Sequence, residues 1–289
     1  METNDLLKKI KRIEITTKGL SKQLFSGDYQ SAFKGSGMTF SEVRNYAYGD
    51  EVRTIDWNVT ARYNEPHIKV FEEEKELTVL LMIDLSGSSN FGTSATKKNL
   101  AIEIAAVLAF TAAQNNDKIG AVIYTDKVEQ YIPAKKGKKH AYAIINACVN
   151  FTQTAEETNL SEAIKHLQSV QKKRAITFII SDFIDDSNYL EKLPFLHKKH
   201  DIVAIKTRDS GEVTLPDFGY IELFNAESSL KTWVNSSDQK VIDYLAKKEV
   251  ESTETWKNSL LKLGIDSIVC STDQAFIPAL VQLFKKRKK

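Results

Sequence analysis

The sequence predicts an α/β protein built on an open, mostly parallel β-sheet with helices on both faces. Four short apolar runs have the length and composition of buried parallel strands, at residues 77–84, 117–125, 174–180 and 201–205. Segments with helical periodicity separate these runs, which favours right-handed crossovers between parallel neighbours. Two of the runs end at or beside a carboxylate: Asp84 is the last residue of the first run, and Asp182 follows the third run after Ser181. Because ligands of such sheets bind beyond the carboxyl ends of the strands, we expect a functional site there.

The composition sets limits on the class of protein. With 289 residues the chain exceeds one ordinary domain of about 100–200 residues, so we expect one large domain with an extension. The 40 basic and 38 acidic side chains give a net charge of +2, which offers no general basis for binding nucleic acid. Cys148 and Cys270 lie in apolar surroundings and are expected to be buried free thiols.

No targeting or membrane signal is recognisable. The longest apolar runs fall short of the roughly 20 residues that a membrane helix needs. The start of the chain is polar and rich in lysine, without the apolar core of a signal peptide. We therefore predict a cytoplasmic protein with no integral membrane segment.

The chain is predicted to divide into an N-terminal extension, residues 1–75, that packs on a main domain, residues 76–289. Leu6, Ile10 and Ile13 recur at helical spacing among lysines, which predicts an amphipathic basic helix docked on its own domain. An anionic partner surface is the alternative for this helix.

Further along the extension, glycines favour loops over residues 19–40, and alternation predicts a strand over 67–71. Residues 40–62 mix arginines with carboxylates and aromatic side chains. Arginine forks bonding buried carboxylates would make this segment a structural clamp on the main sheet. The alternative is a partner-binding surface, for which Arg53 and Trp57 are the candidates.

The remaining elements of the main domain follow from periodicity and turns. Helices are predicted at 95–115, 137–151, 160–170 and 190–197. In the second of these we expect Tyr142, Ile145 and Val149 to face inward. A strand at 127–132 follows so short a turn that antiparallel pairing with the preceding strand is expected.

The C-terminal third is predicted to add a small antiparallel β insertion near 210–235 to the sheet. A long helix over 237–263 ends at Gly264, and a strand over 265–270 and a helix over 276–284 follow. The basic residues at the very end are expected to form a solvated tail, with binding to an acidic partner or a lipid surface as the alternative.

The stretch after the first buried strand carries a candidate cation site. Asp84, Ser86 and Ser88 offer one carboxylate and two hydroxyls at alternate positions, and Gly87 keeps the turn tight. These are the hard oxygen ligands that small divalent cations prefer. Capping of the following helix is the alternative explanation.

Two further oxygen-bearing segments are predicted at the same edge of the sheet. Asp182 follows another buried strand, and Thr158 lies in a polar loop that leads into a helix. With the first loop, they resemble the von Willebrand factor A domain and its metal-ion-dependent adhesion site (MIDAS). Asp84, Ser86 and Ser88 match its first loop, Thr158 its second and Asp182 its third.

The resemblance implies a von Willebrand A-like, Rossmann-like sheet and a bound Mg²⁺ or Mn²⁺. Hydroxyl ligands leave such an ion electron-poor, so it accepts one more anionic oxygen. In domains of this type that oxygen comes from a Glu or Asp of a partner protein. Asn90, Phe91 and Asp185 are candidate partner-binding residues at the rim, with an ordinary loop role as the alternative.

A second resemblance covers nearly the whole chain. The runs Gly49-Asp50, Arg53, Ile55-Asp56-Trp57 and Thr60-Ala61-Arg62 look like the bacterial domain-of-unknown-function family fifty-eight. Its members are often encoded beside MoxR-type AAA+ ATPases, which implies an adaptor or co-chaperone-like partner of such an ATPase or of its client. The family commonly has Met where this chain has Ser89, a position that donates no metal ligand.

Two alternatives remain. The metal site is non-essential and residues 44–62 bind the partner, or the chain is a Mg²⁺-dependent phosphohydrolase with Asp84 as nucleophile. Haloacid-dehalogenase-like phosphatases usually place a second Asp two positions on, where this chain has Ser86. Neither a Gly-x-Ser-x-Gly elbow nor a Walker-type loop is present in the sequence. We therefore expect no catalytic residues.

Overall fold

The computed structural model describes residues 8, 10–11, 38–73, 77–92, 96–152, 155, 157–212, 219–224 and 231–287. They belong to two compact units, one spanning Gly27–Leu77 and the other combining Met1–Ser26 with Thr78–Lys289. The predicted division at residues 75 and 76, and the packing of the extension on the main domain, stay predictions. No helix among the described residues is long and apolar enough to cross a membrane.

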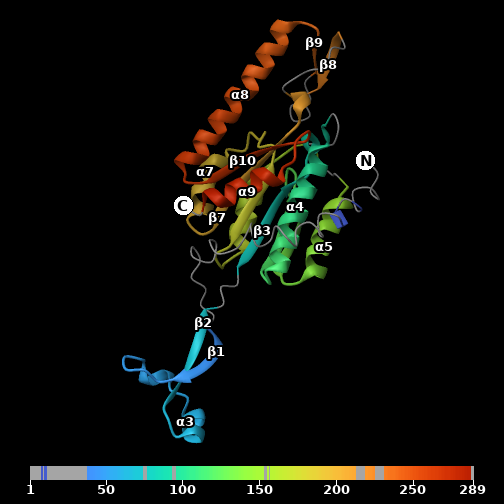
Figure 1. The fold of residues 1–289 in the computed structure, drawn as a ribbon. Coiled ribbons are helices and arrows are strands. Elements are labelled where there is room, and N and C mark those ends of the chain that lie inside the picture. The colour runs from blue at the N-terminus through green and yellow to red at the C-terminus, as the bar shows by residue number, and fades with distance from the viewer. Residues whose placement is uncertain are drawn as a thin grey trace. The chain divides into compact units, whose positions relative to one another are not determined.

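The larger unit is built on a six-stranded sheet with the order β10-β7-β6-β3-β4-β5 in the described residues (Figure 1). Its strands are β3 (Thr78–Asp84), β4 (Lys118–Tyr124), β5 (Val128–Lys135), β6 (Ile176–Ser181), β7 (Asp201–Arg208) and β10 (Asp266–Ser271). Neighbours pair in parallel except β5, which is antiparallel to β4 as predicted. If these six strands are numbered 1 to 6 along the chain, their order from the β5 edge is 3-2-1-4-5-6, which is that of the doubly wound fold. The predicted α/β class with an open, mostly parallel sheet is confirmed, in the arrangement that the von Willebrand A resemblance implies.

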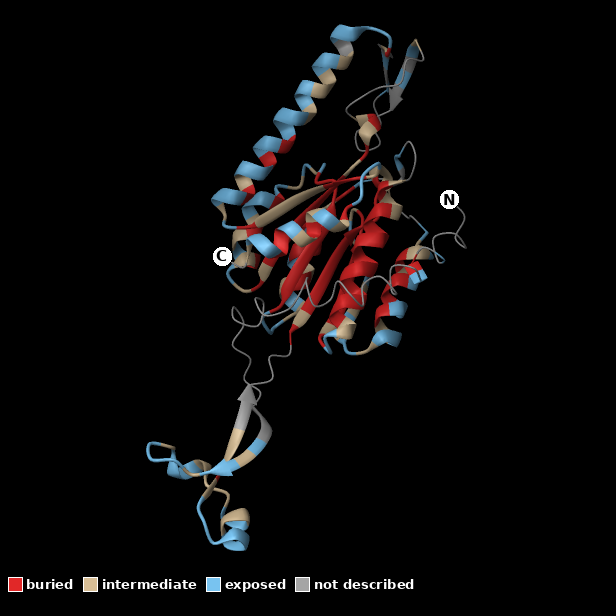
Figure 2. Ribbon diagram, viewed as in Figure 1, coloured by how far each residue is buried: buried red, intermediate tan, exposed pale blue. Residues whose placement is uncertain are grey.

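Helices cover both faces of this sheet, as predicted (Figures 1 and 2). They are α4 (Lys97–Gln114), α5 (Lys138–Val149), α6 (Leu160–Val170), α7 (Tyr189–His197), α8 (Gln239–Lys262) and α9 (Ile277–Lys286). Successive strand residues point to opposite faces. Leu80, Met82 and Ile179 share a buried cluster with α6, α7 and α8. Phe178 points the other way and meets Phe284 of α9 edge-on, with ring centroids 6.1 Å apart. Helices α4 and α5 pack together on that second face.

Both cysteines are buried and free, as predicted. Burial raises the pKa of the thiols of Cys148 and Cys270 to about 12. They are therefore neutral packing residues rather than reactive thiolates.

The inward face predicted for α5 is right for Ile145, which is buried, and wrong for Tyr142, while Val149 is half-buried. Its buried residues are Ala141, Ile144, Ile145 and Cys148, whereas Tyr142 is exposed. Small and aliphatic side chains at helical spacing pack against α4 and the sheet, and the larger Tyr142 ring lies at the border. There it meets the ring of Phe110 at a centroid distance of 4.9 Å.

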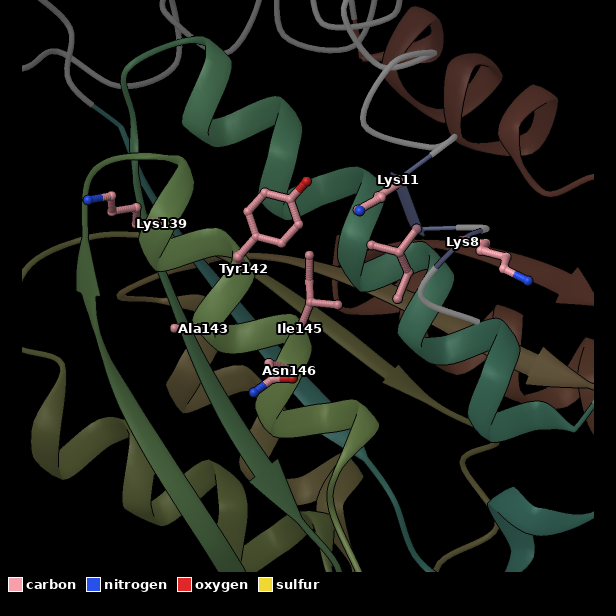
Figure 3. A pocket seen from close by; sticks show the side chains of 8 residues that line it. Lys8, Lys11, Lys139, Tyr142, Ala143, Ile145 and Asn146 are labelled. Atoms are coloured by element: carbon pink, nitrogen blue, oxygen red, sulfur yellow. The ribbon is translucent and has the colours of Figure 1, made fainter. Parts of the chain in front are cut away.

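The N-terminal basic helix is described only at residues 8, 10 and 11, so Leu6 and Ile13 lie outside the described residues. Ile10 is buried, as expected for a helix docked on its own domain. Together with Lys8 and Lys11 it lines a pocket of about 640 Å³, and α5 supplies the other wall (Figure 3).

In the C-terminal third, β8 (Tyr220–Phe224) and β9 (Lys231–Asn235) pair antiparallel as predicted. In the described residues they form a two-stranded sheet of their own, so the expected addition to the six-stranded sheet is wrong. The expected end of the long helix is confirmed, since Gly264 follows α8 with a positive φ of 72°.

The smaller unit contains a hairpin of β1 (Met38–Asn45) and β2 (His67–Glu73), with η1 (Val52–Thr54) and α3 (Trp57–Tyr63) between them. Asp56 begins α3: its carboxylate accepts hydrogen bonds from the amides of Asn58 and Val59 at 3.0 and 3.3 Å. Its other oxygen lies 3.4 Å from the Lys69 ammonium. This cap explains why the run Ile55-Asp56-Trp57 starts a helix.

The predicted arginine fork exists, but its carboxylate is not fully buried. Arg44 donates two hydrogen bonds of 2.8 Å to the two oxygens of Asp50. The side chains are 44% and 19% exposed, so the pair stiffens a turn of the smaller unit. A two-stranded hairpin offers too little covered surface to bury such a pair.

Candidate functional site

The first loop of the predicted site is a tight turn at the carboxyl end of β3. Asp84 is 3% exposed, and its Oδ1 accepts a hydrogen bond of 3.0 Å from the amide of Ser86. The 3₁₀ turn η2 (Gly87–Asn90) follows. It places the hydroxyl oxygens of Ser86 and Ser88 3.2 Å apart. Ser89 donates from its hydroxyl to the Ser86 carbonyl at 2.6 Å and supports this turn.

The neighbouring strand fixes the other oxygen of the same carboxylate. The Ser181 hydroxyl, at the end of β6, donates to Asp84 Oδ2 at 2.6 Å and accepts from the amide of Phe183 at 2.9 Å. Phe183 turns the chain with a positive φ of 57°, and its ring packs against Trp256. Asp182 is thereby held beside the first loop, with its Oδ1 accepting from the amide of Ile184 at 3.1 Å.

The second loop is tied to the same edge of the sheet. Thr158 is buried, and the amide of the next residue, Asn159, donates to the carbonyl of Thr125 beyond the end of β4 at 2.8 Å. The amide of Leu160 then donates to Asp185 Oδ2 at 2.7 Å. Asp185, expected at the rim, thus bonds the first turn of α6 and links the loops that carry Thr158 and Asp182.

Two residues that contact the candidate site, Lys97 directly and Glu212 through it, were missed by sequence reasoning. The Lys97 ammonium, at the start of α4, donates to Asp182 Oδ2 at 2.7 Å and to Glu212 Oε1 at 2.6 Å. The Lys97 side chain is 2% exposed. A lysine in the first turn of an apolar helix, where the helix dipole disfavours a cation, was the signal that could have indicated it. Nothing local in the sequence points to Glu212.

The candidate partner-binding residues Asn90 and Phe91 directly follow the first loop of the site. Phe91 is 48% exposed directly after η2. Asn90 ends η2, and its side chain lies outside the described residues. Arg53 and Trp57 are exposed in the smaller unit.

The two buried carboxylates are in different electrostatic situations. Burial, and next the charge of Asp182, raise the pKa of Asp84 to about 7, although hydrogen bonds from Ser181 and Ser86 oppose the shift. Burial by itself would lower the pKa of Lys97, but the charges of Asp182 and Glu212 outweigh it and raise that pKa. Asp182 therefore has a cationic partner, while the donors to Asp84 among the described residues are all neutral.

This donor set fits a small divalent cation. Adjacent ligands of an octahedral Mg²⁺ ion, each about 2.1 Å from it, lie about 3.0 Å apart. The two hydroxyl oxygens of Ser86 and Ser88 are 3.2 Å apart, close to that spacing. Asp84, a buried carboxylate whose ionisation is disfavoured, lies beside them, and a cation bound there would stabilise its charge. No cluster of three or more His, Cys, Asp or Glu side chains that could hold a metal occurs in the described part of the chain. The candidate site has two carboxylates, Asp84 and Asp182, and its other ligands would be the hydroxyls of Ser86, Ser88 and Thr158.

Comparisons with known proteins give a family. Residues 42–255 match the family described as "Protein of unknown function DUF58". The uncharacterized protein Rv1480 of Mycobacterium tuberculosis is 28% identical over 283 residues, which cover 97% of this chain and 89% of the relative. The uncharacterized protein MAV169 of Mycobacterium avium is 24% identical over 160 residues, 55% of this chain and 94% of the relative.

Solved structures with similarity to this chain include two at 12% identity. The conserved hypothetical protein BatB from Bacteroides thetaiotaomicron covers 73% of this chain and 98% of its own, with a TM-score of 0.46. The SpRpn10 VWA domain covers 71% and 94%, with a TM-score of 0.39.

The buried Asp84 leads to a prediction about stability and pH. Its pKa is about 7 in the folded, metal-free protein and about 3.9 when unfolded, so the folded state holds a proton that the unfolded state has lost between those values. This proton stabilises the folded state fully below about pH 4, and the stabilisation is lost as the pH rises to 7. As the pH rises from 5 to 8, we expect the parent protein to lose about 2–3 kcal/mol of unfolding free energy that Asp84→Asn retains.

Urea unfolding in the presence of a chelator measures this difference. Asp186→Asn, an exposed carboxyl in the loop after β6, is the matched control and should follow the parent protein at both pH values. Equal pH dependence of the parent protein and Asp84→Asn would refute the electrostatic description of the site.

Proposed function

This chain belongs to the DUF58 family, and on that premise we propose that it is a metal-dependent protein–protein interaction module. In this proposal the edge of the sheet binds Mg²⁺ or Mn²⁺ and presents it to a carboxylate of a partner protein. The observation that carries the proposal is the pair of hydroxyls of Ser86 and Ser88, 3.2 Å apart, beside the buried carboxylate of Asp84.

The hydroxyls of Ser86, Ser88 and Thr158 would hold the ion directly. Asp84 and Asp182 would bind it directly or through water. When bound, the ion supplies a coordination position that accepts one further anionic oxygen. The chain's own contribution is to orient the ligands: backbone and hydroxyl donors fix both oxygens of Asp84 before any ion arrives.

The proposed partner is a MoxR-type AAA+ ATPase or its client protein, with this chain as an adaptor or co-chaperone-like subunit in the cytoplasm. Support for it comes from the family resemblance. A partner carboxylate suits the site because hydroxyl ligands leave most of the ion's charge uncompensated.

We propose further that the site is not catalytic. Both oxygens of Asp84 already accept hydrogen bonds, and the group is 3% exposed, which disfavours attack on a substrate phosphorus. A phosphatase screen with Mg²⁺ addresses this directly, because turnover that disappears in Asp84→Asn would establish the rival function.

Calorimetric titration tests the metal site. Mg²⁺ and Mn²⁺ should bind the parent protein with one site per chain, and Asp84→Ala should bind at least tenfold more weakly, because it loses the charge nearest the hydroxyl pair. Asp186→Asn serves as the control with one carboxylate fewer in the same region. Equal binding heats in the parent protein and Asp84→Ala would overturn the assignment.

A second candidate function has an observation of its own. Trp57 is 67% and Tyr63 is 70% exposed on α3, and Tyr48 and Val52 are also exposed. Exposed large apolar side chains on a small unit are typical of interaction surfaces. In this alternative, residues 44–62 bind the partner and the metal site is not essential.

Capture of a co-expressed MoxR-type ATPase separates the two candidates. The metal proposal predicts that chelator or Asp84→Ala abolishes capture, while the double substitution Arg53→Ala, Trp57→Ala leaves it largely intact. The reverse pattern would assign binding to residues 44–62. Circular dichroism on each variant confirms that folding is retained.

A further inference from the structure

Lys97 is a buried cation at the edge of the candidate metal site. It lies in the first turn of α4, and its side chain is 2% exposed. The ammonium donates to Asp182 Oδ2 at 2.7 Å and to Glu212 Oε1 at 2.6 Å. Lys97 therefore contacts one predicted metal ligand directly, from a position 85 residues away in the chain.

This is an unfavourable place for a lysine unless its charge has a use. The N-terminal turn of a helix carries a partial positive charge, and removing an ammonium from water costs free energy. Apolar residues of similar volume often replace buried ion pairs without loss of stability. Packing alone therefore does not explain a lysine at this position. The effect of its charge on Asp182 does.

Glu212, the second partner of Lys97, is itself held in place by the segment that follows β7. Glu212 lies in the short helix η3 (Ser210–Glu212) after β7, and its Oε2 accepts from the amide of Asp209 at 3.1 Å. Asp209 is fully buried, and its carboxylate accepts from the Gly211 amide at 2.8 Å and from the hydroxyl of Thr272, just beyond β10. Lys97 thus links the metal site to the ends of β7 and β10.

The contacts of Asp182 determine how strongly this carboxylate can bind a cation. Oδ1 accepts from the Ile184 amide and Oδ2 from Lys97, so each oxygen already has one donor. The charge of Asp182 is compensated by Lys97, and Glu212 shares the same ammonium. A divalent cation that approaches Asp182 meets a positive charge already within hydrogen-bond distance of that carboxylate.

We propose that Lys97 is the internal counter-ion of the metal site: it holds Asp182 and Glu212 in the metal-free protein and limits the affinity for a divalent cation. This inference rests on the proposed metal site. Binding of the ion weakens the Lys97–Asp182 contact through like-charge repulsion, and Glu212 keeps the ammonium paired while this happens. Site occupancy is thereby coupled to the segment after β7.

Two substitutions give opposite signs, which a purely structural role would not. Lys97→Met removes the competing charge, so we expect Mn²⁺ to bind at least tenfold more tightly. Glu212→Gln leaves the ammonium with Asp182 alone, so we expect binding to be several-fold weaker. Lys97→Arg retains the charge and is the control expected to stay near the parent protein. Affinities are measured by calorimetry with Mn²⁺, and the rise in melting temperature on adding Mg²⁺ gives a second readout.

The outcomes separate this inference from the proposed function. If the parent protein binds Mn²⁺ and Lys97→Met does not bind it more tightly, the counter-ion role is wrong and the metal site stands. If neither the parent protein nor Lys97→Met binds Mn²⁺, both proposals are overturned. Binding gained only in Lys97→Met supports the counter-ion role. Should Lys97→Met fail to fold, Glu212→Gln decides: weaker binding supports the role, and equal or tighter binding contradicts it.

Discussion

A buried carboxylate, Asp84, at the end of the central strand is the constraint on which the rest of the site depends. Removing a charged carboxylate from water is costly unless hydrogen bonds or a cation compensate. Here the compensation is incomplete: the Ser86 amide and the Ser181 hydroxyl stabilise the charge, yet the pKa stays raised to about 7. The surrounding loops are organised around this group, and a divalent cation would complete the compensation of its charge.

The strand register is what brings the two carboxylates together. Ile83 of β3 pairs in parallel with Ile180 of β6, so Asp84 lies level with Ser181 and Asp182 follows one residue later. The charges then differ because Lys97 neutralises Asp182 and leaves Asp84 with neutral donors. The edge of the sheet thus has one carboxylate paired with an ammonium, Asp182, and one held by neutral donors among the described residues, Asp84.

Much of the main domain could be predicted from sequence, because buried strands and amphipathic helices have strong periodic signals. The placement of Asp84 and Asp182 at strand ends followed from the same signals. The contact of Lys97 with Glu212 could not be predicted, since it joins residues 115 positions apart through side chains alone. Strand β1 and helix α3 were missed because the polar, mixed segment over residues 40–62 has no clear period, and only the cap at Asp56 marks the helix.

The central claim is that the hydroxyl pair and the two strand-end carboxylates form one metal site. The most direct test is a crystal structure of the protein in the presence of Mn²⁺, with the ion located by its anomalous scattering. We expect one strong peak about 2.1–2.2 Å from the hydroxyl oxygens of Ser86 and Ser88, beside Asp84. A well-ordered loop with no peak there, or Mn²⁺ found only at other carboxylates, would contradict it.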